Sequence, residues 1–384
     1  MVVTDWHKVR FLESSENLKP LVKMRFGREP STSVARDIAA CLVQGRLFYE
    51  AAISSPLEIR PLQMYYGMVG FAKALVLARH CCSAATLAHA HGLKDISREN
   101  SRIAELQLRV DGAGTFQEFN DVVAELSRVR YIGHSYKRCT ISTPSAKSAQ
   151  LRGLELSLRG ILTRIPELGS LYSMTFGEEA LTAHLIFMQD FVEDDLFKLT
   201  FVHSQKFSDR ESLKRIVGEC RTRFPFLKDW RVHKAWHEGD KSVIEFRNTH
   251  NSDFDEFQES QLDDQSPDGF FGSDVRDVKE VVILAQQLLR PLGGSYGGQI
   301  HAISPVNDLY LSEFSLHYLG LFLLSSLVRY RPQTWAHAIS RSVMADLPAD
   351  DQALSLIEKF LEMNSSEVPS MVVSVLNPHE DEYA

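Results

Sequence analysis

The most apolar stretch of the chain limits its fold more than any other feature. This stretch, LHYLGLFLLSSLV, runs from Leu316 to Val328 and is 13 residues long. A membrane-spanning helix needs roughly 20 apolar residues, so the segment is too short to cross a bilayer. We therefore expect a helix buried in a protein core, and no association with a membrane.

Two amphipathic segments near the start of the chain are suited to pack on that helix. Ser33 to Ile53 carries apolar side chains at three- and four-residue steps, which predicts a helix that ends before Pro56. Pro61 then suits the first turn of a second helix, Leu62 to His80. The short connection predicts that the two helices pack antiparallel.

The end of the chain predicts helices over 309–330, from 335 to about 343, and over 349–363. We expect a mainly α fold, in which N-terminal helices within 1–100 and C-terminal helices within 273–384 form one bundle.

The middle of the chain, 101–250, has a mixed pattern and predicts an α/β insert. Capping boxes at Thr115-x-x-Glu118 and Ser208-x-x-Glu211 indicate the starts of helices. Alternating residues predict strands over 106–110, 231–237 and 243–246, while 151–158 and 181–187 fit a strand or a helix. The acidic stretch 251–272 lacks apolar periodicity and predicts a linker.

Charge and cysteine content narrow the class of protein. The net charge of −8 disfavours broad, non-specific binding of nucleic acid, although a local basic face is compatible with it. The five cysteines form no CxxC pair, which favours reduced thiols and a cytoplasmic location. The mixed, charged first residues do not indicate a signal peptide.

Several long words, in order along the chain, resemble the YaaC-like family. They are QGRLFYEAA (Gln44 to Ala52), IRPLQMYYGMVGFAKALVL (Ile59 to Leu77), His91-Gly92-Leu93, and SLHYLGLFLLSSLVRYRPQTW (Ser315 to Trp335). The resemblance implies a bacterial-type cytosolic protein with an α-rich fold. It implies no settled activity and supplies no catalytic residues.

Arg331 and His337, with Arg329 beside them, form the leading candidate for a catalytic site. Their spacing is similar to the Arg-x4–6-His motif of HEPN ribonucleases, small helical bundles that often dimerise. Without any metal or cofactor, His337 would move a proton and Arg331 would stabilise charge on the phosphate. No acidic residue lies between Glu313 and Asp346, so this junction between helices is expected to be positive.

The same residues also have a structural interpretation. Chance alone predicts about as many such Arg–His spacings as the chain contains, namely Arg128/His134, Arg231/His237 and Arg331/His337. Arg329 and Arg331 are equally suited to bind the last carbonyls of the preceding helix and to pair with carboxylates.

A basic segment, 127–164, is the second candidate for contact with RNA. Its cations include Arg128, Arg130, Lys137 and Arg138, with Tyr131 and Tyr136 between them. This pattern suits phosphates and stacked bases. The alternative is a solvated face that offsets the acidic stretch 251–272.

Weaker patterns have plainer explanations. The loop LGGSYGG lacks the Lys-Ser/Thr of a phosphate-binding loop, and His89-x-His91 has no further ligands nearby to complete a metal site. His233 and His237 are four apart, which on a strand places them on one face, but no third metal ligand is evident. Lys73 lies on nearly the same helix face as Tyr65, which predicts either an internal polar site or a lysine that reaches to water.

The leading functional hypothesis is a HEPN-like RNA-binding protein or metal-independent endoribonuclease, in stress or phage defence, that forms a homo-oligomer. The main alternative is a non-catalytic interaction protein that presents its helical core to a protein partner. A ligand sensor that uses the glycine loop is the third class.

Overall fold

The computed structural model describes 6–99, 101–126, 128–132, 138–142, 145–189, 197–247, 297–339 and 352–378. It divides into two compact units. The helical unit comprises 1–126, 145–180 and 311–384, and the sheet unit comprises 127–144 and 181–310. Residues 101–126 and 145–180, which the sequence analysis assigned to the insert, thus cluster with the helices.

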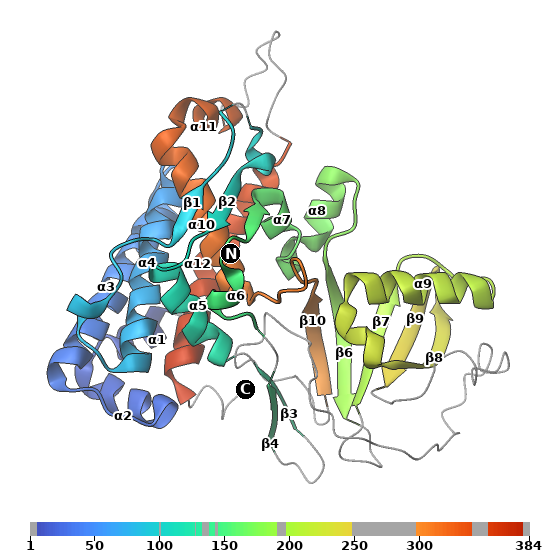
Figure 1. Ribbon diagram of the computed structural model, residues 1–384, viewed down its shortest axis with the longest axis horizontal. Helices are drawn as coiled ribbons and strands as arrows, with labels where there is room; N and C mark the ends of the chain where they lie inside the picture. The colour runs from blue at the N-terminus through green and yellow to red at the C-terminus, as the bar shows by residue number, and fades with distance from the viewer. Residues whose placement is uncertain are drawn as a thin grey trace. The chain divides into compact units, whose positions relative to one another are not determined.

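Two long helices near the start of the chain lie side by side in the helical unit (Figure 1). Helix α3 (Thr32–Ser54) begins at Ser31, whose hydroxyl accepts from the amide of Val34. Helix α4 (Arg60–His80) has Pro61 in its first turn, as predicted. The two pack along their length, and α4 also packs against α5 (Thr115–Glu125), α10 (Glu313–Tyr330) and α12 (Leu354–Leu376).

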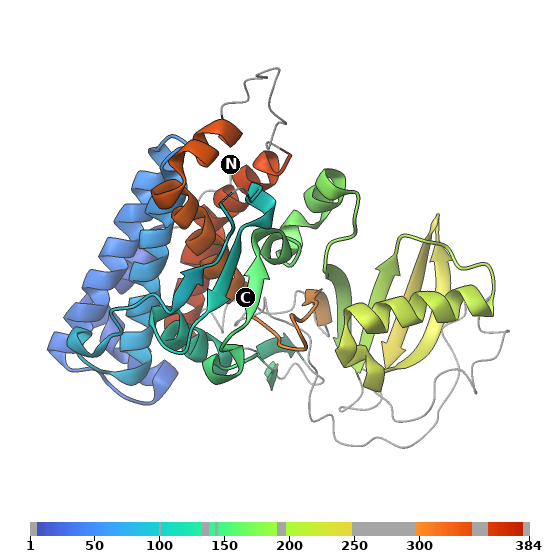
Figure 2. The same cartoon turned by 45° about the horizontal axis from the view of Figure 1, so that its top comes forward.

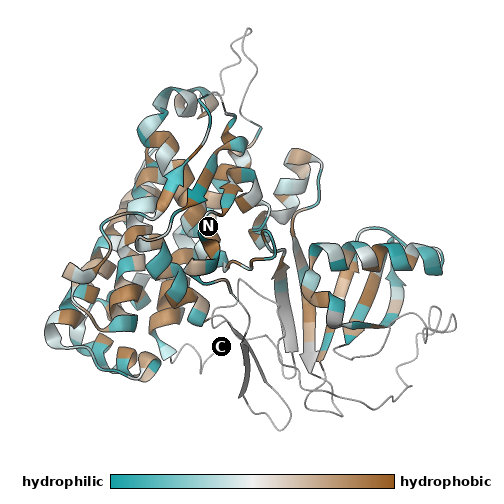
Figure 3. Cartoon of the chain, in the orientation of Figure 1, coloured by the Kyte–Doolittle hydropathy of each residue, from teal (hydrophilic) through white to brown (hydrophobic). Residues whose placement is uncertain are grey.

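The apolar stretch that predicted a buried helix lies in α10, where every residue from Glu313 to Leu327 is buried. Figure 3 shows hydrophobic residues along the helices of this unit, interspersed with hydrophilic ones. The early and late helices therefore meet in one core, and the mainly α fold with a mixed middle region is confirmed. None of the described helices is long and apolar enough to span a membrane.

The remaining helices of this unit are shorter. They are α1 (Trp6–Leu12), α2 (Ser15–Phe26), α6 (Ser148–Leu151), α7 (Leu158–Leu162), α8 (Gly169–Phe176), α11 (Pro332–Ile339) and the single turns Ala84–Thr86, Ile103–Glu105 and Pro166–Leu168. A three-stranded antiparallel sheet has the order β1 (Leu93–Asp95), β2 (Gln107–Val110), β5 (Glu155–Ser157).

The sheet unit is built on a five-stranded antiparallel sheet. Its order is β10 (Gly297–Ile303), β6 (Thr182–Gln189), β7 (Phe197–His203), β9 (Lys241–Arg247), β8 (Arg231–Glu238). Helix α9 (Arg210–Arg223) and the turn Pro225–Asp229 cover one face and enclose an apolar core with it (Figures 1 and 2). A separate hairpin pairs β3 (Arg128–Ile132) with β4 (Arg138–Ser142).

Several predicted element boundaries were wrong; α10, α11 and α12, for example, begin at Glu313, Pro332 and Leu354 and not at 309, 335 and 349. Gly114, rather than Thr115, precedes α5, and the Thr115 hydroxyl instead bonds the carbonyl of Ala90 at 3.2 Å. In α9 the capping box is formed by Asp209 and Ser212, one residue later than predicted. Helix α12 continues to Leu376 through Pro369, because buried apolar side chains keep a helical spacing beyond Met363. The predicted linker 251–272 and a predicted helix over about 274–289 lie outside the described residues.

Candidate functional site

Arg331, the predicted phosphate-binding residue, holds a loop at the end of α10. Its guanidinium donates to the carbonyls of Ser97 at 2.9 Å and Arg98 at 3.0 Å, and lies 3.5 Å from the Asp95 carboxylate. The Arg331 side chain is 19% exposed. These contacts favour the structural interpretation of Arg331, as a positioning residue for the segment that follows β1.

Asp95 completes this anchor. Its carboxylate accepts from the hydroxyls of Ser326 and Ser97, each at 2.6 Å. Burial acts to raise the pKa of Asp95, but these hydrogen bonds outweigh it, and the pKa lies below its ordinary 3.8. An ionised Asp95 therefore ties the C-terminal end of α10 to β1.

His337 lies half-buried in α11. The helix is fixed by its neighbour Trp335, which is buried and donates its indole N–H to the carbonyl of Glu58 at 3.0 Å. The proposed proton transfer by His337 stays a prediction.

A different imidazole lies in a more reactive setting. The phenol oxygen of Tyr65, in α4, lies 2.8 Å from Nδ1 of His91, and the two rings are 5.5 Å apart. Phe322 of α10 packs against both rings. Tyr65 is buried, which raises its pKa and keeps the phenol protonated, whereas His91 is half-buried.

Arg329 lies beside this pair, as the third member of the cluster. Its guanidinium carbon is 5.7 Å from the centre of the Tyr65 ring, and its nitrogens also bond Ser325 one turn earlier. Burial lowers the pKa of His91 below 6.5, and the positive charges of Arg329 and Lys73 lower it further. His91 is therefore neutral at pH 7 and able to accept a proton. We call Tyr65, His91 and Arg329 the imidazole cluster.

The backbone around His91 is tightly specified by α5. The amides of Thr115 and Phe116, at the start of α5, donate to the carbonyls of Ala90 and His91. Gly92 follows with a φ of 76°, and an added Cβ there would collide with the Gln117 side chain. Only glycine fits this turn, which directs the His91 ring towards α4.

The imidazole cluster has the groups that phosphate-ester chemistry uses. In the tautomer in which the Nδ1–H of His91 donates to the phenol oxygen of Tyr65, Nε2 carries the lone pair and can accept a proton. None of the described residues forms a hydrogen bond with Nε2. A neutral imidazole is a general base, and a guanidinium binds phosphate oxygens.

Comparison with known proteins supports the family resemblance that is seen in the sequence. A family model, described as YaaC-like Protein, matches residues 10–376. The chain belongs to the YaaC-like family. The match includes the imidazole cluster, so these residues lie within the family region. Neither the curated proteins nor the solved structures yielded a match.

The predicted basic segment is only partly described in this YaaC-like chain. Arg128 and Arg130 lie in β3 and Arg138 in β4, where the backbone alone is described, and Lys137 lies outside the described residues. Their contact with RNA stays a prediction.

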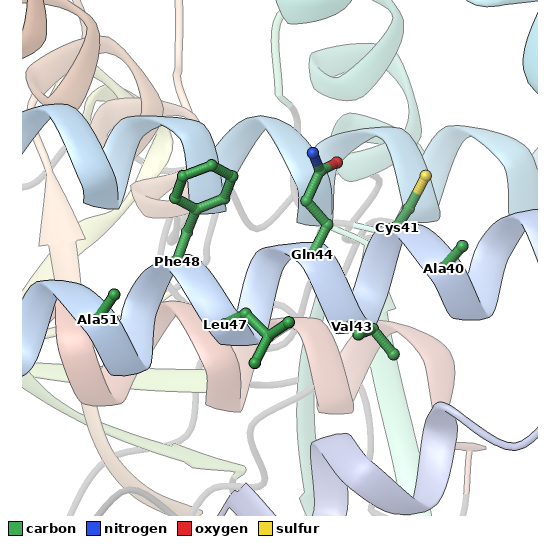
Figure 4. Close-up of a pocket in the computed structure, with 7 residues that line it drawn as sticks. All are labelled: Ala40, Cys41, Val43, Gln44, Leu47, Phe48 and Ala51. Atoms are coloured by element: carbon green, nitrogen blue, oxygen red, sulfur yellow. The ribbon is translucent and has the colours of Figure 1, made fainter.

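An apolar groove lies along α3 and has a volume of about 730 Å³. Its lining residues are Ala40, Cys41, Val43, Gln44, Leu47, Phe48 and Ala51, and Figure 4 shows Cys41, Gln44 and Phe48 pointing to one side of the helix. Burial raises the pKa of the Cys41 thiol, which stays protonated and is a poor nucleophile. The groove is therefore better suited to binding an apolar surface than to catalysing a reaction.

His233 and His237 do not share a face, contrary to the prediction. A bulge in β8, between Val232 and Lys234, inserts one residue and reverses the alternation. His237 packs on Phe207 of the core side, while His233 lies 3.8 Å from Glu245 on the other face.

No sequence pattern joins the three members of the imidazole cluster. The sequence places Tyr65 on a helix face with Lys73, predicts that His91 ends a helix, and sets Arg329 beside Arg331. The available signal was the glycine after His91, which indicates a turn that fixes the preceding side chain.

Proposed function

We propose that the protein is an RNA-binding, metal-independent endoribonuclease whose general base is His91. The observation that carries the proposal is the 2.8 Å contact between Tyr65 and His91, with Arg329 adjacent. The sequence-based hypothesis assigned the same chemistry to His337 and Arg331. The bonds of Arg331 to Ser97 and Arg98 favour Arg329 as the guanidinium that binds phosphate.

The reaction follows from these groups. Nε2 of His91 takes the proton of an RNA 2′-hydroxyl, the 2′-oxygen attacks phosphorus, and the bond from phosphorus to the 5′-oxygen breaks. Arg329 stabilises the charge on the non-bridging oxygens. The leaving 5′-oxygen takes a proton from water, and the protonated His91 gives its proton to the hydroxide that remains. The products are a 2′,3′-cyclic phosphate and a 5′-hydroxyl.

The test is to incubate the full chain with end-labelled single-stranded RNA in the presence of EDTA. We expect cleavage that leaves a 2′,3′-cyclic phosphate, and no cleavage of the matching DNA, which lacks the attacking hydroxyl. Cleavage of the DNA, or dependence on added metal, would contradict this mechanism.

The rival proposal is a non-catalytic interaction protein, and the groove on α3 favours it. Leu47 in this groove is 53% exposed, and none of the lining residues is charged. The partner that we propose for this rival is a second copy of the chain. Sedimentation would show a homo-oligomer that Leu47→Glu dissociates and Met174→Glu, at the exposed α8, leaves intact.

A further inference from the structure

The five-stranded sheet has one face that the described helices leave uncovered. Helix α9 packs on the side of Leu199, Phe201 and Phe246. On the opposite side, Ile186 is 40% and Val202 is 47% exposed. A sheet face that carries exposed apolar side chains suits a ligand.

Basic side chains form a row across three strands at one end of this open face. The strand registers place Lys198 opposite Arg247, and Arg247 opposite Arg231. The three side chains concentrate positive charge at this end of the face, which suits phosphate groups. Lys234 adds a fourth cation, opposite Glu245.

The pKa of His233 reflects the electrostatic field of these cations. Its pKa is lowered to about 3, first by burial and then by Arg247, Lys234, Lys198 and Arg231. All four cations therefore act on one point of the open face. Glu245 lies among them, 3.7 Å from Arg247, and offsets one charge. At the end of the β8–β9 hairpin, Glu238 lies opposite Lys241.

Apolar groups lie at the other end of this face, where Lys234, Glu245 and Thr200 separate them from the basic row. Trp236 is opposite Val243, and Val243 is opposite Val202. Trp236 follows Lys234 by two residues, which is about 7 Å along a strand and on the same face. A cation and an aromatic ring in this order suit a nucleotide, with its phosphate on Lys234 and its base on Trp236.

We propose that the open face of the sheet, through Lys198, Arg231, Lys234, Arg247 and Trp236, binds single-stranded RNA. This inference rests on the proposed RNA-directed function but assigns a site in the other unit. The aromatic and apolar row distinguishes it from a site for an acidic peptide, which needs the cations alone.

Fluorescence anisotropy with the full chain and a labelled 2′-O-methyl RNA of roughly 12 nucleotides tests the proposal. This RNA lacks the attacking hydroxyl, so binding is measured without cleavage. We expect Lys198→Glu with Lys234→Glu to weaken binding at least tenfold. The slope of log affinity against log salt concentration should become shallower by about one unit per lost phosphate contact.

The matched control is Arg215→Glu, an exposed residue of α9 on the covered side of the sheet. It makes the same change of charge in the same unit, and we expect binding within twofold of the unchanged chain. Trp236→Ala should weaken binding several-fold, with recovery in Trp236→Phe. Circular dichroism of each variant verifies folding.

Three outcomes would overturn the inference. The first is an equal loss of RNA binding in Arg215→Glu and in the double variant. The second is unchanged RNA binding in the double variant. The third is that an added acidic polypeptide competes with the labelled RNA as well as unlabelled RNA does, while Trp236→Ala has no effect on binding. Failure of the proposed cleavage reaction can be told apart from failure of this inference. If the protein does not cleave RNA but still binds 2′-O-methyl RNA through this face, the inference holds.

Discussion

At His91, a nearby cation adjusts the acid–base behaviour of the proposed site. Replacing Arg329 by Gln removes one of the charges that lower the pKa of His91. We expect the pKa to rise but to stay below 6.5, because burial is the larger cause and persists. Titration of the His91 ring by NMR measures this change. An unchanged or lowered pKa would place Arg329 away from the imidazole.

His233 gives a second prediction, on stability. Its pKa is about 3 in the folded protein and close to the ordinary 6.5 in the unfolded chain. Because the unfolded chain binds more protons within this window, the free energy of unfolding falls as the pH drops from 6.5 towards 3. His233→Gln removes the contribution of His233 to this pH dependence, while Glu245 and the four surrounding cations remain.

Thermal melting of the unchanged chain and of His233→Gln across this pH range checks the prediction. The unchanged chain should lose melting temperature more steeply on acidification. Two parallel curves would contradict the assignment of this titration to His233.

Among the elements, helices α3 and α4 meet through glycines. An alanine Cβ at Gly67 would lie 2.5 Å from the ring of the buried Tyr49 and 3.0 Å from the carbonyl of Gly45. Gly67→Ala should therefore destabilise the protein by about 1–3 kcal/mol, although alanine is the better helix former.

The control for this change is Gly218→Ala in α9, where nothing lies within 4 Å of the added carbon. It should stabilise the protein by about 0.5–1 kcal/mol. Denaturant unfolding of both variants measures the difference. Equal effects of the same sign would show that helix propensity, rather than close packing, dominates at Gly67.

The helices of the core were predictable from sequence because their apolar spacing is local information. Ser31 and Pro61 mark the starts of α3 and α4, and both helices form within two residues of expectation. The imidazole cluster was not predictable, because it joins Tyr65, His91 and Arg329 from three separate segments. Their meeting depends on how α10 is placed against α4, which no local pattern encodes.

The bulge in β8 shows the same limit within one strand. Alternation placed His233 and His237 together, and a single inserted residue separates them. The basic row of the open face likewise depends on cross-strand register, which follows from the pairing of β7, β9 and β8.

At the scale of the whole molecule, we propose that the helical unit cleaves RNA and the sheet unit binds it. Variants of the two units should then change different kinetic constants of RNA cleavage. Lys198→Glu with Lys234→Glu should raise the RNA concentration needed for half-maximal cleavage, with the rate at saturation unchanged. Arg329→Gln should lower the rate at saturation by about 10²–10³-fold. A loss of saturated rate in the sheet variant would contradict this division.

The most direct test is the single-turnover rate of RNA cleavage in EDTA for the unchanged chain, His91→Asn and His337→Ala. We predict that His91→Asn lowers the rate by about 10²–10⁴-fold, the usual contribution of a general base, while His337→Ala retains most of it. Cleavage that persists in His91→Asn, or that is lost only in His337→Ala, would contradict the assignment of His91 as the base.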